Sequence, residues 1–490
     1  AFAAEPPPAA PLPSAPPHLT AFAESPAPEP PRPPAAPAAS DTLLRVEIST
    51  RHLLGMLALG GWAAAIGAQW LLLQKRSDVG LPLLLWAAAV GLSWPLFRWF
   101  ARSKPAAASS RISLSWPRAL NLQNALDFLV PGVRKIPALI ALMATFLAYW
   151  LNGNNTFTES GVAAWLVAVV AWFVALWEGE LRLPTRDSLR RMRPHGAFSL
   201  RLPYALLPLL GVLIVAGYFR FAQLPAIPAE MTSDHVEKLL DVNDVLHGLN
   251  NVFFPRNTGR EALQFYWAAL IATSLGTGLT HLTLKISSAV AGFVTIPFIY
   301  LLAKEWEDET TGLLAALLAA MAFWPTAIAR VGLRFPFNPM AAAPALYFLF
   351  RGLRRGSRND FLWAGLAVGV GLHGYSPFRF VPVAMAVIIG LYFLFPQNTG
   401  GRARLIQQVV GLGAVTLAVF APLLRYLHDD PAMFWFRSAT RFGSEEQPLP
   451  APAAQLLWTN LKNGLTMCNF TGDRGWVNTL PGQPSLDYLM

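Results

Sequence analysis

The chain has 490 residues, of which 54% are hydrophobic and only 13% are charged. Soluble domains usually carry about 25% charged residues, so this composition excludes an ordinary soluble enzyme and predicts an all-α polytopic membrane protein. The net charge of +10 is compatible with nucleic-acid binding, but the basic residues cluster at the ends of apolar segments, as in cytoplasmic loops. We therefore expect no nucleic-acid partner. The single cysteine, Cys468, excludes an internal disulfide and a cysteine-based metal site.

Residues 1–40 are rich in proline and alanine and lack the apolar stretch of a cleavable signal peptide. Such a segment cannot bury a core, so we predict a disordered or polyproline-II-like tail, with a docking peptide for a partner as the alternative. Residues 41–202 are predicted to form an N-terminal membrane region with four spans, through which protein partners could attach. Its apolar segments are 52–74, 80–100, 136–151 and 160–178.

Basic residues between the apolar segments predict the orientation of the chain. Residues 101–135 and 179–202 are rich in arginine, so the positive-inside rule places both in the cytoplasm. The next apolar segment, 203–222, then runs outward and places residues 223–261 on the external side. We therefore expect a multi-pass protein of the cytoplasmic membrane.

The following apolar stretches do not fit a simple alternation. The external residues 223–261 and the segment "ARVGLRFPFNP", which is also predicted to be external, enclose three apolar stretches. Only an even number of crossings can connect two segments on the same side. We expect the first stretch, 262–279, to be interfacial or re-entrant.

The last part of the chain contains a helix pair and a final span. An outward segment and a returning one enclose the external turn "YSPFR", and 406–427 is the last predicted span. The membrane core is thus expected over 203–427. Residues 428–490 are expected to be an external loop region, truncated at its end.

The stretch "MTSDHVEKLLDVNDVLHGL" predicts an amphipathic helix on the membrane surface. Its polar side carries Glu237, Lys238, Asp241 and Asp244, and its apolar side carries Val236, Leu239, Leu240, Val242, Val245, Leu246 and Leu249. Asp234 is a candidate N-cap, with Glu237 as the partner of a capping box. The alternative is that the Asp234 carboxylate accepts a proton from an acceptor hydroxyl.

Several arginines are expected near the outer ends of spans. Each one alone is typical of a snorkelling side chain. If they converge on one outer cavity, they suit a phosphate-bearing lipid, because guanidinium groups bind phosphate oxygens bidentately. These residues are Arg260, Arg330, Arg334 and Arg379.

Several segments, taken in order, resemble those of the GT-C glycosyltransferases. The acid in "TSDHVEKLLD" follows an outward span, and "GREALQFYW" stands where relatives have a basic-Pro-Pro-Leu-type motif. The stretches "FRGLRRGSRNDFLWAGLAVGVGLHGYSPFRFVP" and "NFTGDRGWVNTLPGQPSLD" are similar in the same order. Over residues 203–490 the chain therefore resembles the branch that contains dolichyl-phosphate-mannose–protein mannosyltransferases and aminoarabinose transferases. The resemblance implies a GT-C-like helix bundle with amphipathic outer-face helices.

The resemblance also implies a reaction. A sugar would move from a polyprenyl-phosphate donor to a protein, lipid or glycan acceptor outside the bacterial inner membrane. Asp234 matches the catalytic acid of the first external loop and would act as general base, with inversion at the sugar carbon. The basic residues that match the phosphate-holding positions are Arg260, Arg330, Arg334 and Arg379. Further site candidates are Glu261, His235, Tyr375 and His373, the last with a packed helix-end histidine as its alternative.

Two departures from the family pattern affect this interpretation. His235 stands where relatives carry a second acid, and Asn338 occupies the position of an acid in the second external loop. Divalent cations prefer carboxylate oxygens, so a divalent metal is disfavoured as a cofactor and no other cofactor is expected. The main alternative is a catalytically degenerate GT-C-like scaffold subunit of a larger membrane complex. A transporter with a buried charge at Lys285 is the third interpretation.

Overall fold

The computed structural model describes residues 132–179, 206–394, 401–440 and 449–467, with a few isolated positions before and after them. The predicted tail 1–40 and the segment 80–100 lie outside the described residues, as do almost all of 52–74, 101–135 and 179–202 and much of the C-terminal region. All elements below belong to one compact unit, Leu57–Met490.

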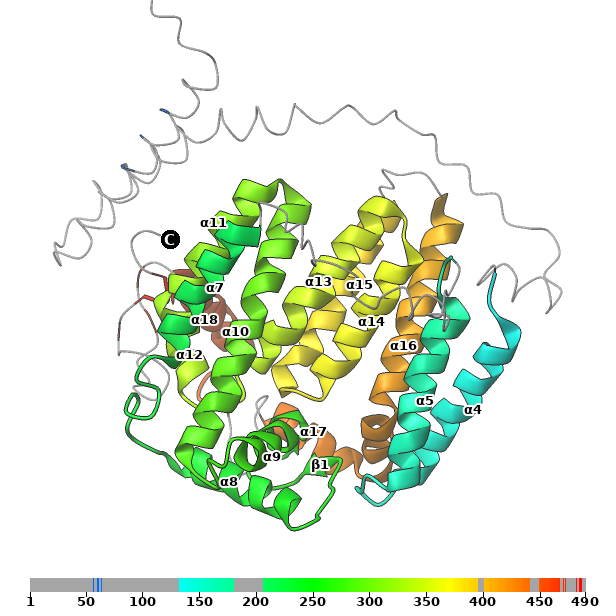
Figure 1. The fold of residues 1–490 in the computed structure, drawn as a ribbon, viewed down its shortest axis with the longest axis horizontal. Helices are drawn as coiled ribbons and strands as arrows, with labels where there is room; N and C mark the ends of the chain where they lie inside the picture. The colour runs from blue at the N-terminus through cyan, green and yellow to red at the C-terminus, as the bar shows by residue number, and fades with distance from the viewer. Residues whose placement is uncertain are drawn as a thin grey trace, which may run out of the picture. The chain divides into compact units, whose positions relative to one another are not determined.

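The predicted all-α polytopic membrane fold is confirmed. Within the described ranges, 4 helices are long and apolar enough to cross a membrane (Figure 1). They are α5 (Glu159–Leu176), α10 (His281–Trp306), the combined helix Ser376–Leu394 formed by η1 (Ser376–Arg379) and α15 (Phe380–Leu394), and α16 (Gly401–Asp429). Large apolar side chains on their outer faces are exposed, as expected for contact with lipid rather than water.

Further helices complete the bundle. Two shorter apolar helices are α4 (Lys135–Leu151) and α7 (Leu206–Phe221). A span broken by a 54° bend consists of α11 (Glu309–Met321) and α12 (Phe323–Arg330). The remaining two are α13 (Phe337–Arg355) and α14 (Arg358–Leu372). The 15 residues of α14, which we expected to cross outward, extend about 22 Å and fall short of a full crossing.

Local sequence signals set the helix boundaries. The Asp308 carboxylate accepts a hydrogen bond from the Thr311 backbone N–H (2.8 Å) and begins α11. Gly356 ends α13 in the left-handed region (φ 63°), and Ser357 then caps α14. These are the residue types that satisfy unpaired backbone groups at helix ends.

Small residues allow the helices to pack closely, as is usual in membrane bundles. Gly365 and Gly369 lie one turn apart on α14, and a Cβ at either would come within 2.5 Å of Leu412 or Val419 on α16. A Cβ on Gly292 of α10 would lie 2.6 Å from Ala329 of α12. Larger residues at these positions would separate the helices.

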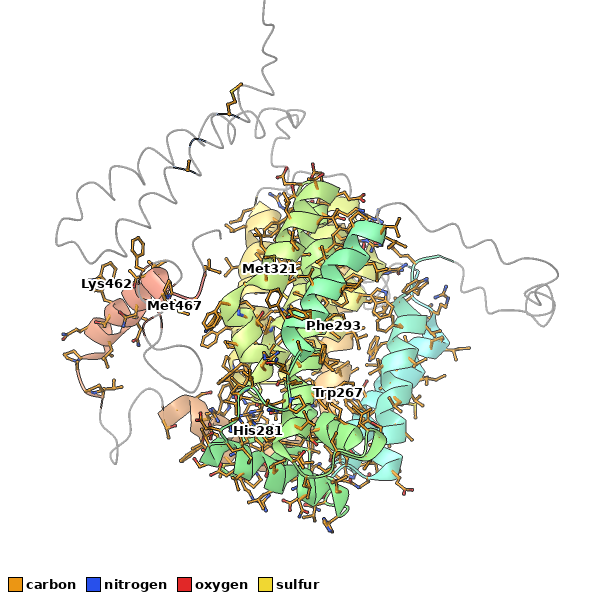
Figure 2. All side chains as sticks on the ribbon, turned by 60° about the vertical axis from the view of Figure 1, so that its left-hand side comes forward. Trp267, His281, Phe293, Met321, Lys462 and Met467 are labelled. Carbon is orange, nitrogen blue, oxygen red and sulfur yellow. The ribbon has the colours of Figure 1, made fainter. Side chains whose placement is uncertain are left out.

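One end of the bundle is covered by short elements, which we call the network end. Figure 1 shows them together below the long helices. They are α8 (Ser233–Leu246), β1 (Phe253–Phe254), β2 (Arg260–Glu261), α9 (Leu263–Ser274) and α17 (Pro431–Ala439). Trp267 and His281 lie toward this end and Met321 lies toward the other (Figure 2). A separate helix, α18 (Ala453–Met467), stands beside the bundle.

The length of α9 indicates whether the stretch 262–279 crosses the membrane. It has 12 residues and is therefore about 18 Å long, well short of the hydrocarbon thickness. It packs on α8 and α10 at the network end. This agrees with the expectation that the stretch 262–279 does not cross.

The α4–α5 hairpin is joined to the network end through its loop. The Asn155 amide donates to the Phe253 carbonyl (2.7 Å) and accepts from the Phe253 N–H (2.8 Å). Thr156 and Asn251 form a further antiparallel bridge. The described part of the N-terminal region thus supports β1, although it lies outside the predicted family resemblance.

Candidate functional site

The helix α8 begins at Thr232. Thr232 is the N-cap, and its backbone N–H donates to Nδ1 of His235 (3.0 Å) at the third helical position. Asp234 lies inside the first turn, so the alternative in which Asp234 caps the helix is wrong. Its carboxylate is left for other interactions.

His235 occupies the place of the second acid expected from relatives, and the structure gives it a packing role. Its Nε2 lies 2.7 Å from the Val331 carbonyl oxygen. One neutral tautomer, with Nδ1 accepting and Nε2–H donating, satisfies both contacts. Burial lowers the pKa of His235, which favours that neutral form. The side chain ties the start of α8 to the segment after α12.

The polar side of α8 faces the protein. Lys238 and Asp241 are buried, whereas Val236 and Leu240 are 49% and 47% exposed. The surface helix was predicted correctly, but a solvated polar side would have been the ordinary arrangement of such a helix. Here Val236 and Leu240 point away from the bundle and Lys238 and Asp241 point into it, while Val242 packs in the core.

The β1–β2 hairpin brings two charged residues under α8. Asn257, Thr258 and Gly259 all have positive φ, and a Cβ at Gly259 would lie 2.7 Å from the Phe253 ring. The tight turn sets Phe254 opposite Arg260. It also directs the Asn257 amide, which donates to Oδ1 of Asp234 (2.7 Å).

Arg260, predicted to hold phosphate, is bound to carboxylates of α8. Its side chain is 1% exposed and donates to Asp241 Oδ2 (2.8 Å) and to Glu237. Arg256 also contacts Asp241 (2.9 Å) and bonds to Asp244. With its charge neutralised in this way, Arg260 fixes β2 to α8 and does not face a ligand space.

Glu261 is the centre of a second buried cluster. Its carboxylate accepts from Arg334 (3.2 Å) and Arg379 (3.0 Å) and from the Ser376 hydroxyl (3.0 Å). Arg379 also lies over the Phe434 ring, 4.0 Å from its centroid. Two predicted phosphate ligands thus share one acid, which joins β2, the segment after α12 and η1, with a net charge of +1.

Arg330 and His373 have contacts of a structural kind. Arg330 donates to the carbonyls of Phe219 and Ala222 (2.8 Å each) at the end of α7. Nε2 of His373 lies 3.0 Å from the Val419 carbonyl oxygen, and its side chain is buried. For His373 this agrees with the packed helix-end alternative, and Arg330 does not join the Glu261 cluster.

Asp234 itself is exposed and surrounded by positive charge. Partial burial raises the pKa of the Asp234 carboxyl, but Lys238, the Asn257 hydrogen bond, Arg260 and Arg437 outweigh this effect and hold the pKa below its ordinary value. The carboxylate is therefore ionised at neutral pH and able to accept a proton.

Two cations beside Asp234 were missed by the sequence interpretation. Lys238 donates to the Asp234 backbone carbonyl (2.8 Å), and burial lowers its pKa to about 7. Arg437 of α17 acts on Asp234, Lys238 and Arg334, and in the described part of the chain no carboxylate lies within ion-pair distance of it. Helical spacing placed Lys238 on the polar side of α8, but nothing in the sequence placed Arg437 opposite it.

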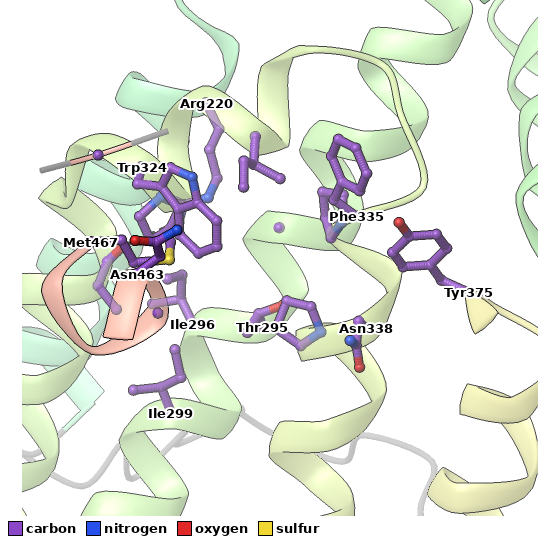
Figure 3. Close-up of a pocket in the computed structure, with 18 of the residues that line it drawn as sticks. Arg220, Thr295, Ile296, Ile299, Trp324, Phe335, Asn338, Tyr375, Asn463 and Met467 are labelled. Carbon is purple, nitrogen blue, oxygen red and sulfur yellow. Dashed lines mark hydrogen bonds between the residues drawn. The ribbon is translucent and has the colours of Figure 1, made fainter. Parts of the chain in front are cut away.

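The structure also contains a cavity of about 960 Å³ (Figure 3). It lies between α10, α12, α13 and α18, and its walls are mostly apolar, with Trp324 on one side and Phe335 and Tyr375 on the other. The Arg334 guanidinium lies 5.3 Å from the Tyr375 ring centroid. Tyr375 therefore separates the cavity from the Glu261 cluster, and Asn338 also lines the cavity.

The described residues include no group of three or more His, Cys, Asp or Glu side chains that could hold a metal ion. Glu237, Asp241, Asp244 and Glu261 are instead bound to arginines. Fold and site together define a multi-pass helical membrane protein with a buried charge network at one end and a mostly apolar cavity between its helices.

Comparison with known proteins agrees with the predicted resemblance. Residues 260–426 match the family model "Dolichyl-phosphate-mannose-protein mannosyltransferase". The match covers Arg260, Glu261, Arg330, Arg334 and Arg379, and it begins after Asp234 and Lys238. The resemblance to this family is thereby confirmed for the matched segment.

The comparisons with solved structures and with curated proteins give a weak similarity and no match, respectively. Among solved structures, the chain is similar to the archaeal oligosaccharyltransferase AglB from Archaeoglobus fulgidus, in complex with an inhibitory peptide and a dolichol-phosphate. The identity is 16%, the TM-score 0.34, and the similarity covers 54% of this chain and 37% of that chain. The chain thus spans little more than a third of that relative. No curated protein matches it.

Proposed function

We propose that the chain is a membrane glycosyltransferase that transfers a sugar from a polyprenyl-phosphate donor to an acceptor on the outer side of the cytoplasmic membrane. The observation that carries the proposal is the exposed carboxylate of Asp234, which accepts from the Asn257 amide and has Lys238 one turn further along α8. The family model matched by residues 260–426 supports the donor class.

Each group has a role in the proposed reaction. Asp234 takes the proton of an acceptor hydroxyl, whose oxygen then bonds to the sugar carbon from the side opposite the donor oxygen. The bond from that carbon to the phosphate oxygen breaks, and the phosphate leaves with its electron pair. The sugar carbon is inverted once, and the hydroxyl of a protein, a lipid or a glycan has the chemistry that this acceptor needs.

The leaving phosphate needs positive charge that is not already neutralised. Arg260 is neutralised by Asp241 and Glu237, and Arg334 and Arg379 share Glu261. We therefore propose that Arg437 and Lys238 bind the phosphate. The net positive charge of the Glu261 cluster adds to the stabilisation of the leaving phosphate. The cavity beside Tyr375 would hold the isoprenoid chain.

Basic residues at the opposite end of the bundle support this orientation. The last turn of α13 carries Arg354 and Arg355, and the start of α16 carries Arg402 and Arg404. The positive-inside rule assigns that end to the cytoplasm. Residues 223–261 and α17 would then be external.

The decisive experiment is transfer by an Asp234→Asn variant in membranes supplied with polyprenyl-phosphate sugars. Loss of a general base lowers the rate by about 100-fold or more. Glu230→Gln is the matched control, because Glu230 is an exposed acid just before α8 and should leave transfer unchanged. Equal transfer rates for Asp234→Asn and the native chain would refute the role of Asp234 as the general base.

The phosphate assignment has its own test. Arg437→Ala should weaken retention of a radiolabelled polyprenyl phosphate by about tenfold, the size of one charge-assisted contact. Arg425→Ala is the control, since Arg425 is paired with Asp429 (2.9 Å) on α16. Unchanged retention by Arg437→Ala would remove Arg437 from the site.

One observation favours a scaffold subunit as the second candidate. Three predicted phosphate ligands are bound to the chain's own carboxylates, an arrangement that an inactive relative would also keep. If the native protein transfers no sugar and purifies in a stable complex with other membrane proteins, the scaffold interpretation replaces the enzymatic one.

A further inference from the structure

The helix α18 closes one side of the cavity with a defined helical face. The residues on this face recur at helical spacing. They are Asn460, Asn463, Gly464 and Met467, and Thr466, which lies further round the helix, also lines the cavity. The helix α18 thus lies across the cavity from α10 and α12, and Asn463 and Met467 project into the cavity opposite Tyr375 (Figure 3).

A second face of α18 is apolar and uncovered. Leu457, Trp458, Leu461 and Leu465 are 72%, 68%, 51% and 71% exposed. At about 100° per residue these four lie on one side of the helix, which adjoins the cavity face near Leu457. No residue of α18 is buried, so this face has no partner in the described structure.

The third face is polar. Gln455, Thr459 and Lys462 lie together there, and Lys462 is the only charged residue of the helix. A helix with one apolar face and one polar face is typical of the interface between lipid and water. Trp458 and Lys462 are residue types that anchor at this depth.

The neighbours of α18 indicate what covers its apolar face. The cavity that α18 closes is lined by α10, a candidate span, by the broken span α11–α12 and by Arg220 of α7. Exposed apolar residues of α7, such as Leu210 and Ile214, belong to the surface that meets acyl chains. The helix α18 therefore stands next to lipid.

We propose that α18 is a lipid-seated lid. Its face formed by Leu457, Trp458, Leu461 and Leu465 lies among acyl chains of the leaflet beside it, and its face around Asn463 closes the cavity. The partner of this surface is the bilayer itself. The proposal does not depend on the sugar-transfer reaction and holds for a scaffold as well.

Spin-label accessibility in phosphatidylcholine–phosphatidylglycerol vesicles tests the proposal on the full chain. Labels are placed singly at Leu461, Leu465, Thr459 and Asn463 after Cys468→Ser has removed the native thiol. At Leu461 and Leu465 oxygen should collide several-fold more often than a water-soluble nickel chelate. At Thr459 the order should reverse, and at Asn463 both collision rates should be low.

Two outcomes would overturn the proposal. Nickel access at Leu461 equal to that at Thr459 would place α18 in water. Exclusion of both reagents from Leu461 and Leu465 would show that a protein, such as a second copy of the chain, covers the face.

A paired substitution tests whether the lipid seat keeps the lid closed. Leu461→Glu with Leu465→Glu should raise nickel access at a label on Asn463 several-fold, because charges leave the acyl chains. Thr459→Glu with Lys462→Glu, on the polar face, should leave it unchanged. An unchanged signal in both pairs would show that lipid does not hold the lid.

Discussion

The two ends of the helix bundle both carry ion pairs, but they use them differently. At the end formed by the α10–α11 and α13–α14 turns, Lys304 and Glu309 pair at 3.1 Å with side chains 40% and 43% exposed. At the network end, Arg260 and Asp241 pair at 2.8 Å with side chains 1% and 0% exposed. Exposed pairs add little stability. Buried pairs rarely add more than apolar residues would, but they are costly to break.

The difference indicates what each set of charges is for. The exposed basic residues at the first end are of the kind that the positive-inside rule uses to predict orientation. The buried pairs fix β2 to α8, and they fix η1 and the segment after α12 to β2. A charge network kept at this cost is expected where positions matter more than stability.

The largest expected effect follows from removing the acid shared by Arg334 and Arg379. Glu261→Ala should lower the free energy of unfolding by about 3–5 kcal/mol, because it leaves buried arginines without a counter-charge. Glu309→Ala, at the exposed end, should cost less than about 1 kcal/mol. Denaturant unfolding in detergent measures both, and equal losses would remove the distinction between the ends.

A smaller effect concerns the pH dependence of stability. The pKa of Lys238 is lowered to about 7 by burial, near Arg334, Arg260 and Arg437 and opposite Asp234. Between about pH 7 and the ordinary lysine value of 10.5, the unfolded chain therefore binds a proton that the folded chain does not. Stability from this group rises with pH across that window, by up to about 1.4 kcal/mol per unit.

The measurement compares two lysines, one at each end. Lys238→Met should flatten the rise in unfolding free energy between pH 7 and 10, whereas Lys304→Met should leave it in place. A slope that persists in Lys238→Met would show that other groups cause it.

A still smaller loss of stability is expected when the N-cap of α8 is removed. Thr232→Ala should lower the unfolding free energy by about 1 kcal/mol, the usual cost of removing an N-cap side chain. Ser233→Ala is the control, because Ser233 is exposed and lies one residue inside the helix. The same unfolding titration reports both, and equal losses would contradict the assignment of the cap to Thr232.

The smallest effect is expected at the exposed end. Arg355 pairs with Glu305 at 2.9 Å with its side chain 56% exposed. Arg355→Ala should change the unfolding free energy by about 0.5 kcal/mol or less, and 1 M salt should remove even that difference. A loss above about 2 kcal/mol would show that this end too depends on its charges.

Much of the fold could be predicted because hydrophobic length is a local property. The segments 136–151, 160–178 and 203–222 became α4, α5 and α7 with small shifts at their ends. The surface helix at Met231–Leu249 and the break in the span pattern after Glu261 were also visible. Helices in a membrane satisfy their own backbone groups, so each segment reveals itself without its neighbours.

The site was less predictable because its ion pairs join residues that are far apart in the sequence. Arg260, Arg334 and Arg379 were expected to be available for a phosphate, yet their partners Asp241 and Glu261 occupy them. A basic residue near the outer end of a span gives the same signal in either case. Which cations remain available for a phosphate is decided only when β2 approaches α8 and η1 approaches the segment after α12.

By itself, the sequence determined that the protein is a helical membrane protein, where its apolar helices lie, and that an acidic surface helix follows α7. Composition and periodicity carry this information because burial in lipid depends on each segment's own side chains. The tertiary structure decided that α8 buries Lys238 and Asp241, that His235 joins the cap of α8 to Val331, and that the Asn257 amide binds Asp234. These facts depend on contacts between residues up to 96 positions apart in the chain, which no local pattern encodes.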